Sequence, residues 1–169
     1  MTVRRILGVD PGLRITGYGM IECRAGSYTL VEGGVLEPRV DLPLELRLAQ
    51  LHAAMVEVVE ATRPDCMVVE ELWTSYKNPT TAVLMGHARG VIALAAGSHG
   101  VILEHLAHAT VKRALVGSGA ARKTQVSGMV VALLGLAAAP QPVDVSDALA
   151  LALAFANIDQ QRSRLPGVR

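Results

Sequence analysis

The sequence has few aromatic residues and almost no net charge, and both shortages narrow what the protein can be. Aromatic residues make up 3% of the 169 residues, with one tryptophan and one phenylalanine, so an aromatic side chain in an expected loop is worth weighing as a binding residue. The formal net charge is +1. This excludes a histone-like protein that is basic all over, and it confines any nucleic-acid contact to a local patch.

Cysteine and long apolar runs are also scarce. The two cysteines, Cys23 and Cys66, fall inside expected strands, which favours small core residues of a reduced, cytoplasmic protein over a disulfide framework. Although 51% of the residues are hydrophobic, their longest runs are well short of the ~20 residues that cross a bilayer. No apolar signal-peptide segment is found near the N-terminus. We expect one domain over residues 1–159, a polar, frayed tail over residues 160–169, and no membrane contact.

The apolar residues that are present follow regular patterns. These patterns predict strands at residues 3–10, 16–23, 28–36, 66–70 and 101–104, and helices at residues 44–62, 80–98, 109–115, 122–134 and 145–157. A three-stranded meander followed by two strand–helix units predicts an α/β fold: a mixed five-stranded sheet with an antiparallel meander, two parallel strands and helices on both faces. This arrangement resembles the ribonuclease H-like architecture, which unrelated activities share.

Carboxylates occur at the ends of buried segments, where an unpaired charge is costly. Asp10 ends an apolar strand and is followed by a Pro-Gly turn, and Glu70 ends another buried strand. If the two strands are parallel neighbours, their carboxyl ends lie side by side, where α/β proteins form ligand sites. Asp144 and Asp147 open the last expected helix and share one face of it.

The placements on the first strand and on the last helix also have a plainer explanation, whereas that of Glu70 is harder to dismiss. Asp10 can cap the turn that follows it, and Asp144 with Asp147 can be a helix cap and a favourable charge at the helix dipole. The coincidence of all these placements favours a metal site instead, because clustered carboxylates repel one another unless cations occupy the site. Carboxylate ligands suit Mg²⁺ or Mn²⁺, and two such ions can promote hydrolysis of a phosphodiester bond by an activated water.

The histidines offer no competing arrangement. No Cys/His spacing predicts zinc, and no Ser-His-Asp or Cys-His pairing is evident. We interpret all five histidines as solvated or structural, including His105 and His108, which lie near the end of the fifth expected strand.

Short motifs spaced along nearly the whole chain accompany these carboxylates. They are Gly8-Val9-Asp10-Pro11-Gly12 with Thr16-Gly17-Tyr18-Gly19, Val69-Glu70, Gly86-x-Ala88-Arg89-Gly90, Lys123-x-Gln125-Val126 and Asp144-x-x-Asp147-Ala148-Leu149-Ala150. In order and spacing they resemble the RuvC family, the bacterial Holliday-junction resolvases of the ribonuclease H-like superfamily.

The resemblance implies a homodimer that nicks two strands of like polarity at a four-way DNA junction, in DNA recombination and repair. It implies the RuvA–RuvB branch-migration complex as a partner. It also implies two Mg²⁺ ions per active site, with Mn²⁺ as a substitute. The residues that would hold them are Asp10, Glu70, Asp144 and Asp147.

Two pairs of basic residues, Lys112-Arg113 and Arg122-Lys123, flank the glycine-containing segment 116–121. They can be a solvated helix surface, but cations beside a flexible backbone also suit phosphate contacts. The resemblance implies that Lys112 and Lys123 lie near the active site or on DNA.

The expected loop after the fourth strand carries Trp73, Tyr76, Lys77 and Asn78. Trp73 can cover the core, or it can stack on the bases of a strained junction. The resemblance implies that an aromatic residue here acts at the junction. Arg14 is a weaker candidate for contact with the DNA backbone.

The residues leave other functions open. The helix at 80–98 is rich in small residues, which suit either packing on the sheet or a two-fold interface; the sequence alone leaves this undecided, and the resemblance favours a dimer. Another ribonuclease H-like nuclease, acting on RNA or hybrids, fits the same carboxylates. A non-catalytic junction-binding module fits the fold, although the four acidic residues argue against it. A sugar-kinase-like ATPase needs a second lobe for which the chain is too short.

Overall fold

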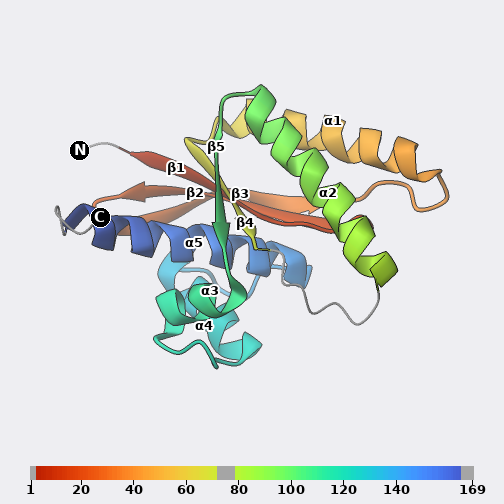
Figure 1. Ribbon diagram of the computed structural model, residues 1–169. Coiled ribbons are helices and arrows are strands. Elements are labelled where there is room, and N and C mark those ends of the chain that lie inside the picture. Colours follow the sequence, from red (N-terminus) through yellow and green to blue (C-terminus); the bar gives the residue numbers. More distant parts are fainter. Residues whose placement is uncertain (1–2, 72–78, 165–169) are drawn as a thin grey trace.

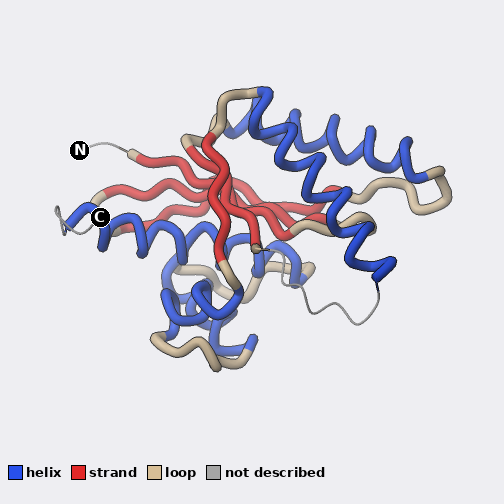
Figure 2. Tube along the Cα trace, in the orientation of Figure 1, coloured by secondary structure: helices blue, strands red, loops and turns tan. Residues whose placement is uncertain are grey.

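The computed structural model describes residues 3–71 and 79–164, and its centre is a five-stranded mixed sheet (Figures 1 and 2). The strands are β1 (Arg4–Asp10), β2 (Thr16–Arg24), β3 (Ser27–Leu36), β4 (Cys66–Glu70) and β5 (Ile102–Leu106). Their order is β3-β2-β1-β4-β5. Strand β2 is antiparallel to both β1 and β3, whereas β4 is parallel to both β1 and β5. The predicted meander, parallel strands and α/β class are confirmed.

Helices cover both faces of the sheet, as the sequence predicts. Helices α1 (Leu44–Thr62) and α2 (Pro79–Ser98) lie on one face. Helix α5 (Val143–Arg164) lies on the other, with α3 (His108–Val116) and α4 (Lys123–Leu134) outside it (Figure 1). Because successive strand residues point to opposite faces, Leu7 of β1 packs with α1 and α2, whereas Ile6 packs with α5.

Helix α5 is buried on nearly all sides, since it lies between the sheet and the α3–α4 pair. Its residues from Ala148 to Ala156 are all buried and are alanine, leucine or phenylalanine. Its backbone approaches the sheet so closely that two strand positions need glycine. A Cβ on Gly8 would lie 1.9 Å from the Ala148 carbonyl oxygen, and a Cβ on Gly17 would lie 2.2 Å from the Asp144 carbonyl oxygen. These two glycines bring the start of α5 against β1 and β2.

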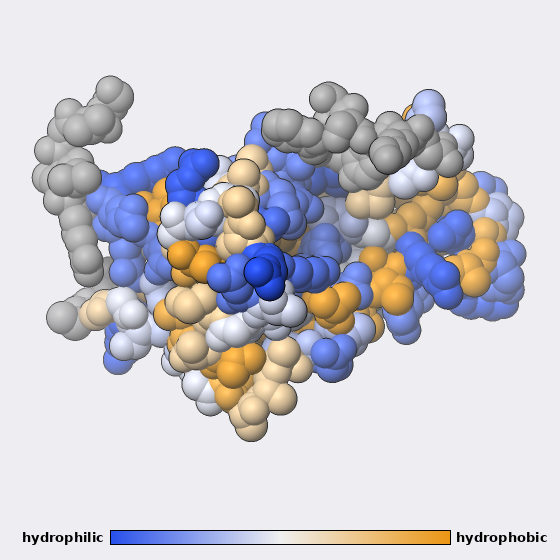
Figure 3. Space-filling view, turned by 90° about the horizontal axis from the view of Figure 1, so that it is seen from below, coloured by the Kyte–Doolittle hydropathy of each residue, from blue (hydrophilic) through white to orange (hydrophobic). Residues whose placement is uncertain are grey.

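The surface on the α3–α4 side mixes hydrophilic and apolar side chains (Figure 3). Within residues 3–71 and 79–164, no helix combines the length and apolar character needed to cross a membrane. Cys23 and Cys66 are both buried and free, and burial raises the pKa of the Cys66 thiol to about 11.

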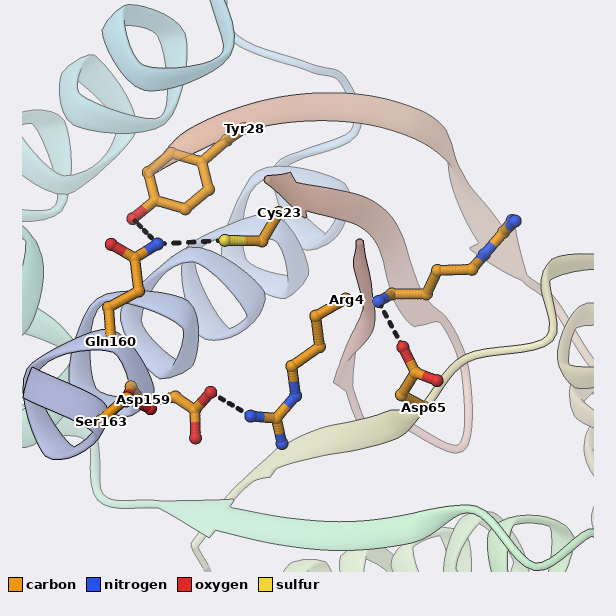
Figure 4. A network of polar contacts seen from close by, with 8 residues as sticks. Arg4, Cys23, Tyr28, Asp65, Asp159, Gln160 and Ser163 are labelled. Carbon is orange, nitrogen blue, oxygen red and sulfur yellow. Dashed lines mark hydrogen bonds and ion pairs between the residues drawn. The ribbon is translucent and has the colours of Figure 1, made fainter. Parts of the chain in front are cut away.

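The C-terminal segment differs from the prediction of a frayed tail. Helix α5 continues to Arg164, well past its predicted end, so residues 160–164 are helical. The Gln160 side-chain amide donates to Cys23 Sγ at 3.0 Å and to the Tyr28 hydroxyl at 3.3 Å (Figure 4). These contacts with β2 and β3 explain why a polar segment that looks like a tail remains in the helix.

Strand β5 also extends beyond its predicted end at residue 104. It ends at Leu106, which pairs with Glu70 of β4, and α3 begins almost immediately at His108. The start of α3 therefore lies at the edge of the sheet where β4 ends.

Candidate active site

Three carboxylates from three different elements line one small pocket of about 80 Å³. Asp10 ends β1, Glu70 ends β4, and Asp147 lies near the start of α5. Strands β1 and β4 are parallel neighbours with Val9 opposite Val69, so their carboxyl ends meet at one edge of the sheet, as the sequence predicts. The other charged or titratable side chains of the lining are His108, Lys112 and Lys123.

The loop after β1 is closed by its own residues. The buried Thr16 hydroxyl donates to the Gly12 carbonyl oxygen at 2.6 Å and accepts from the Gly12 N–H at 3.1 Å. Arg47 of α1 donates from Nη2 to the Leu13 carbonyl oxygen at 3.0 Å. Because Thr16 closes the Pro-Gly turn, Asp10 is not needed as its cap.

Helix α5 supplies the remaining acidic residues, and it places them differently. Asp147 lines the pocket, whereas Asp144 does not. The main chain of Asp144 lies against Gly17 of β2, and its charge still acts on the Asp10 carboxyl. The sequence predicts that Asp144 and Asp147 share one face of the helix; in the structure Asp147 lies in the pocket and Asp144 lies beside it.

The pocket holds more negative charge than its own cations neutralise. The pKa of Asp10 is raised to about 7, first by burial and then by the charges of its acidic neighbours, Asp147, Glu70 and Asp144. Lys123 opposes this rise in part. Its Nζ donates to Asp147 Oδ2 at 2.6 Å, and this hydrogen bond raises the pKa of the lysine.

The donor chemistry of the pocket fits Mg²⁺ or Mn²⁺. Carboxylate oxygens are the ligands that these ions prefer, and a divalent cation would relieve the repulsion that raises the pKa of Asp10. Within the described residues, however, no three His, Cys, Asp or Glu side chains converge on one point. Glu70 instead directs Oε1 to His108, and Asp147 directs Oδ2 to Lys123. The full set of four metal ligands stays a prediction.

The structure divides the predicted basic residues into two groups. Lys112 on α3 and Lys123 on α4 line the pocket. Arg113, Arg122 and Arg14 are exposed and are not part of its lining. The predicted residues of the loop after β4 lie outside the described residues: Trp73, Tyr76, Lys77 and Asn78.

Two residues that the sequence reasoning did not assign to the site contact Glu70. The Arg89 guanidinium of α2 donates to the main-chain carbonyl oxygen of Glu70. His108 Nδ1 lies 2.7 Å from Glu70 Oε1, so the interpretation of His108 as merely solvated or structural was incomplete. The available signal was its place near the end of the fifth expected strand, but the pairing of that strand with β4, which brings His108 to Glu70, could not be recognised from local spacing.

The strand order is that of a ribonuclease H-like domain. Its pocket contains two carboxylates from the ends of parallel central strands and a third from the helix packed across them. The model of the family described as crossover junction endodeoxyribonuclease RuvC matches residues 6–155. The chain therefore belongs to the RuvC family.

Relatives support this assignment over most of the chain. The RuvC protein of Moorella thermoacetica is 45% identical over 160 residues, which are 94% of this chain and 95% of the relative. The RuvC protein of Desulforamulus reducens is 43% identical over 151 residues, 89% of this chain and 92% of the relative. The structure is similar to that of Thermus thermophilus RuvC in complex with a Holliday junction substrate, with a TM-score of 0.89, 34% identity, and coverage of 94% of this chain and 96% of the other.

Proposed function

We propose that this chain is a Holliday-junction resolvase that nicks two strands of like polarity at a four-way DNA junction by metal-dependent hydrolysis. The observation that carries the proposal is the pocket in which Asp10, Glu70 and Asp147 meet two lysines, in a chain of a crossover junction endodeoxyribonuclease family. The solved relative that holds a Holliday junction substrate supports the same class of DNA.

We infer that the pocket takes Mg²⁺, or Mn²⁺ in its place, with two ions per site. Asp10, Glu70 and Asp147 would hold them, with Asp144 beside the pocket as the fourth candidate. When bound, such ions lower the pKa of a water and stabilise the charge of the leaving oxygen in phosphodiester hydrolysis. The chain itself contributes the acidic cluster whose repulsion the ions offset, and that repulsion makes cation binding favourable.

The lysines of the lining suit the substrate rather than the metal. Lys112 and Lys123 line the same pocket as the three carboxylates, so their positive charges can attract a phosphate that the carboxylates alone would repel. Arg14, Arg113 and Arg122 are exposed outside the pocket, where they can contact flanking phosphates. Contacts with the DNA bases would need other residues, and we propose Trp73 for that role.

We further propose that the protein works as a homodimer, because paired nicks on a roughly two-fold junction need two active sites. An open apolar hollow of about 400 Å³ lies between α1 and α2, lined mainly by α2. Val83 and Leu94 on its rim are 58% and 60% exposed, and the space above Gly86 and Gly90 is open. We propose that a second copy of the chain covers this face. We also propose the RuvA–RuvB complex as a partner and the cytoplasm as the location, which is what the resemblance to the RuvC family implies.

The test is to incubate a labelled synthetic four-way junction with the protein and Mg²⁺, beside a linear duplex and a DNA:RNA hybrid of matching sequence. Denaturing gels should map paired, symmetric nicks in the junction alone, and these nicks should disappear in EDTA. Faster cleavage of the hybrid would favour the ribonuclease alternative. Junction binding without cleavage in either Mg²⁺ or Mn²⁺ would favour the non-catalytic module.

A further inference from the structure

The main chain of Glu70 is held firmly on several sides. Glu70 pairs with Leu106 in the β4–β5 ladder, and the Glu71 N–H donates to the Leu106 carbonyl oxygen at 2.8 Å. Arg89 donates to the carbonyl oxygen of Glu70 from the opposite side, where α2 passes. None of these contacts restrains the glutamate side chain, which has several rotatable bonds between its backbone and its carboxylate.

The side chain of Glu70 is held by His108. The His108 Nδ1 to Glu70 Oε1 distance is 2.7 Å, which is a normal length for a hydrogen bond to a carboxylate. An ionised carboxylate can only accept, so the imidazole donates from Nδ1–H. This leaves Glu70 Oε2 outside the hydrogen bond, and both residues still line the pocket that contains Asp10 and Asp147.

The position of His108 is itself set by packing against the helix that carries Asp147. His108 is the first residue of α3, and α3 is anchored in the core by Val111 and Leu115, which pack with α5. The contact between α3 and α5 therefore sets the distance between the group that orients Glu70 and the carboxylate of Asp147. A change in the α3–α5 packing would alter both sides of the pocket together.

We propose that His108 is a positioning residue that holds the Glu70 carboxylate in the pocket, with one oxygen left for a divalent cation. This inference deepens the proposed function, and its cleavage readout rests on that function. Outer hydrogen-bond partners of metal ligands orient those ligands, and their loss typically lowers metal affinity by about 10- to 100-fold. Because the His108 side chain is 70% exposed, its hydrogen bond contributes little to the stability of the fold.

The experiment measures Mn²⁺ binding to the protein without DNA, by the electron paramagnetic resonance signal of free Mn²⁺, in His108→Ala, His108→Asn and the parent. His108→Ala should bind Mn²⁺ about 10-fold more weakly or worse. His108→Asn, whose amide nitrogen can take the place of Nδ1, should stay within about 3-fold of the parent because it keeps the hydrogen bond. His99→Ala is the matched control, since His99 lies 3.5 Å from Glu60 in another His–Glu pair away from the pocket, and it should leave Mn²⁺ binding unchanged.

Two further readouts separate positioning from a structural role. The thermal midpoint of His108→Ala should match the parent, and in junction cleavage kcat should fall while KM for the junction stays the same. Equal or tighter Mn²⁺ binding by His108→Ala would overturn the proposal, and tighter binding would show that His108 competes with the ion. A parent protein that binds no Mn²⁺ would also overturn it. Failure of the parent to cut junctions, with the Mn²⁺ results as expected, would reject the proposed function and leave the positioning role standing.

Discussion

The two ends of the central sheet differ in how their charges are balanced. At the end where β1 begins, Arg4 pairs with Asp159 (Figure 4), and the Arg5 N–H donates to Asp65 at 2.7 Å. The Arg4 guanidinium also lies over the Phe155 ring, 5.3 Å from its centroid. At the end where β1 and β4 finish, burial first and acidic neighbours second raise the pKa of Asp10 to about 7. At the first end the charged groups named here are paired, whereas at the second end Asp147 is paired with Lys123 but the Asp10 carboxyl has no ion-pair partner among the described residues.

This difference is a better guide to function than the size of a cavity. The cavity at the Arg4 end is about 710 Å³, and the acidic pocket is about 80 Å³. The larger cavity is bordered by polar groups that already satisfy one another, such as Arg4 with Asp159 and Gln160 with Cys23. The smaller pocket holds one buried carboxyl, Asp10, whose pKa is raised, and a perturbed carboxyl of this kind is typical of functional sites.

The largest expected effect is on junction cleavage, which should depend on the end of the sheet that carries Asp10 and not on the end that carries Asp159. Asp10→Asn should lower junction cleavage by about 1000-fold or more, because it removes a carboxylate that metal-assisted hydrolysis requires, and it should leave junction binding intact. Asp159→Asn, at the other end of the sheet, should cleave like the parent. Rates are read from denaturing gels and binding from gel shifts in Ca²⁺. An undiminished rate in Asp10→Asn would refute the site assignment.

The unmatched charge should also appear as a pH dependence of stability in EDTA. Folded Asp10 keeps its proton up to about pH 7, whereas the unfolded chain releases it near the ordinary value of 3.8. Between these values the folded state binds more protons, so the free energy of unfolding falls as pH rises, and the loss is complete above about pH 7. At about 1.4 kcal/mol per pKa unit, the loss is at most about 4 kcal/mol.

Urea unfolding of the parent and Asp10→Asn from about pH 4 to about pH 8 checks this. The difference in unfolding free energy between the two proteins should grow with pH in favour of the variant. A difference that stays constant over this range would show that Asp10 is not under electrostatic strain.

The close approach of α5 to the sheet can be tested by adding a methyl group to a glycine that lies between them. Gly8→Ala should destabilise the fold by about 3 kcal/mol, because its Cβ would meet the Ala148 carbonyl oxygen. Gly128→Ala is the matched control, since no atom lies within 4 Å of its added Cβ in helix α4, and it should be neutral or stabilising by up to about 1 kcal/mol. Urea midpoints measure both. Equal effects would show that α5 can shift without cost.

The cations of the pocket should matter more than those beside it. Lys123→Met should lower cleavage by about 10-fold, because Lys123 is the ammonium in contact with Asp147. Arg122→Met, one residue away and exposed, should mainly weaken junction binding and lower its salt dependence by about one charge. Single-turnover cleavage and binding at several salt concentrations separate the two. Identical behaviour of the two variants would mean that Lys123 acts only as a phosphate contact.

The smallest expected effect is on the unfolding free energy, at the end of the sheet where β1 begins. Asp159→Asn breaks a partly exposed ion pair with Arg4, so it should cost less than about 1 kcal/mol of unfolding free energy. Urea unfolding measures this cost. A much larger loss would show that the C-terminal turns of α5 depend on this pair more than on the Gln160 contacts.

Much of the architecture could be predicted from local patterns. The strand ends at Asp10 and Glu70 were visible because an apolar run stops at a carboxylate, and the start of α5 was marked by Asp144 and Asp147. Because β1 and β4 are parallel neighbours, the carboxylates of Asp10 and Glu70 at their ends lie near each other. Such features depend on residues that are close in sequence, on strand pairing, or on helical spacing.

The sequence by itself therefore determined the order and type of the elements and which carboxylates end them. Only the tertiary structure decided the extension of α5 through Gln160, the continuation of β5 to Leu106, and the contacts of Arg89 and His108 with Glu70. The physical reason is that these features depend on partners far apart along the chain. Burial and hydrogen bonding between distant segments override local propensity, and no local spacing of residues records them.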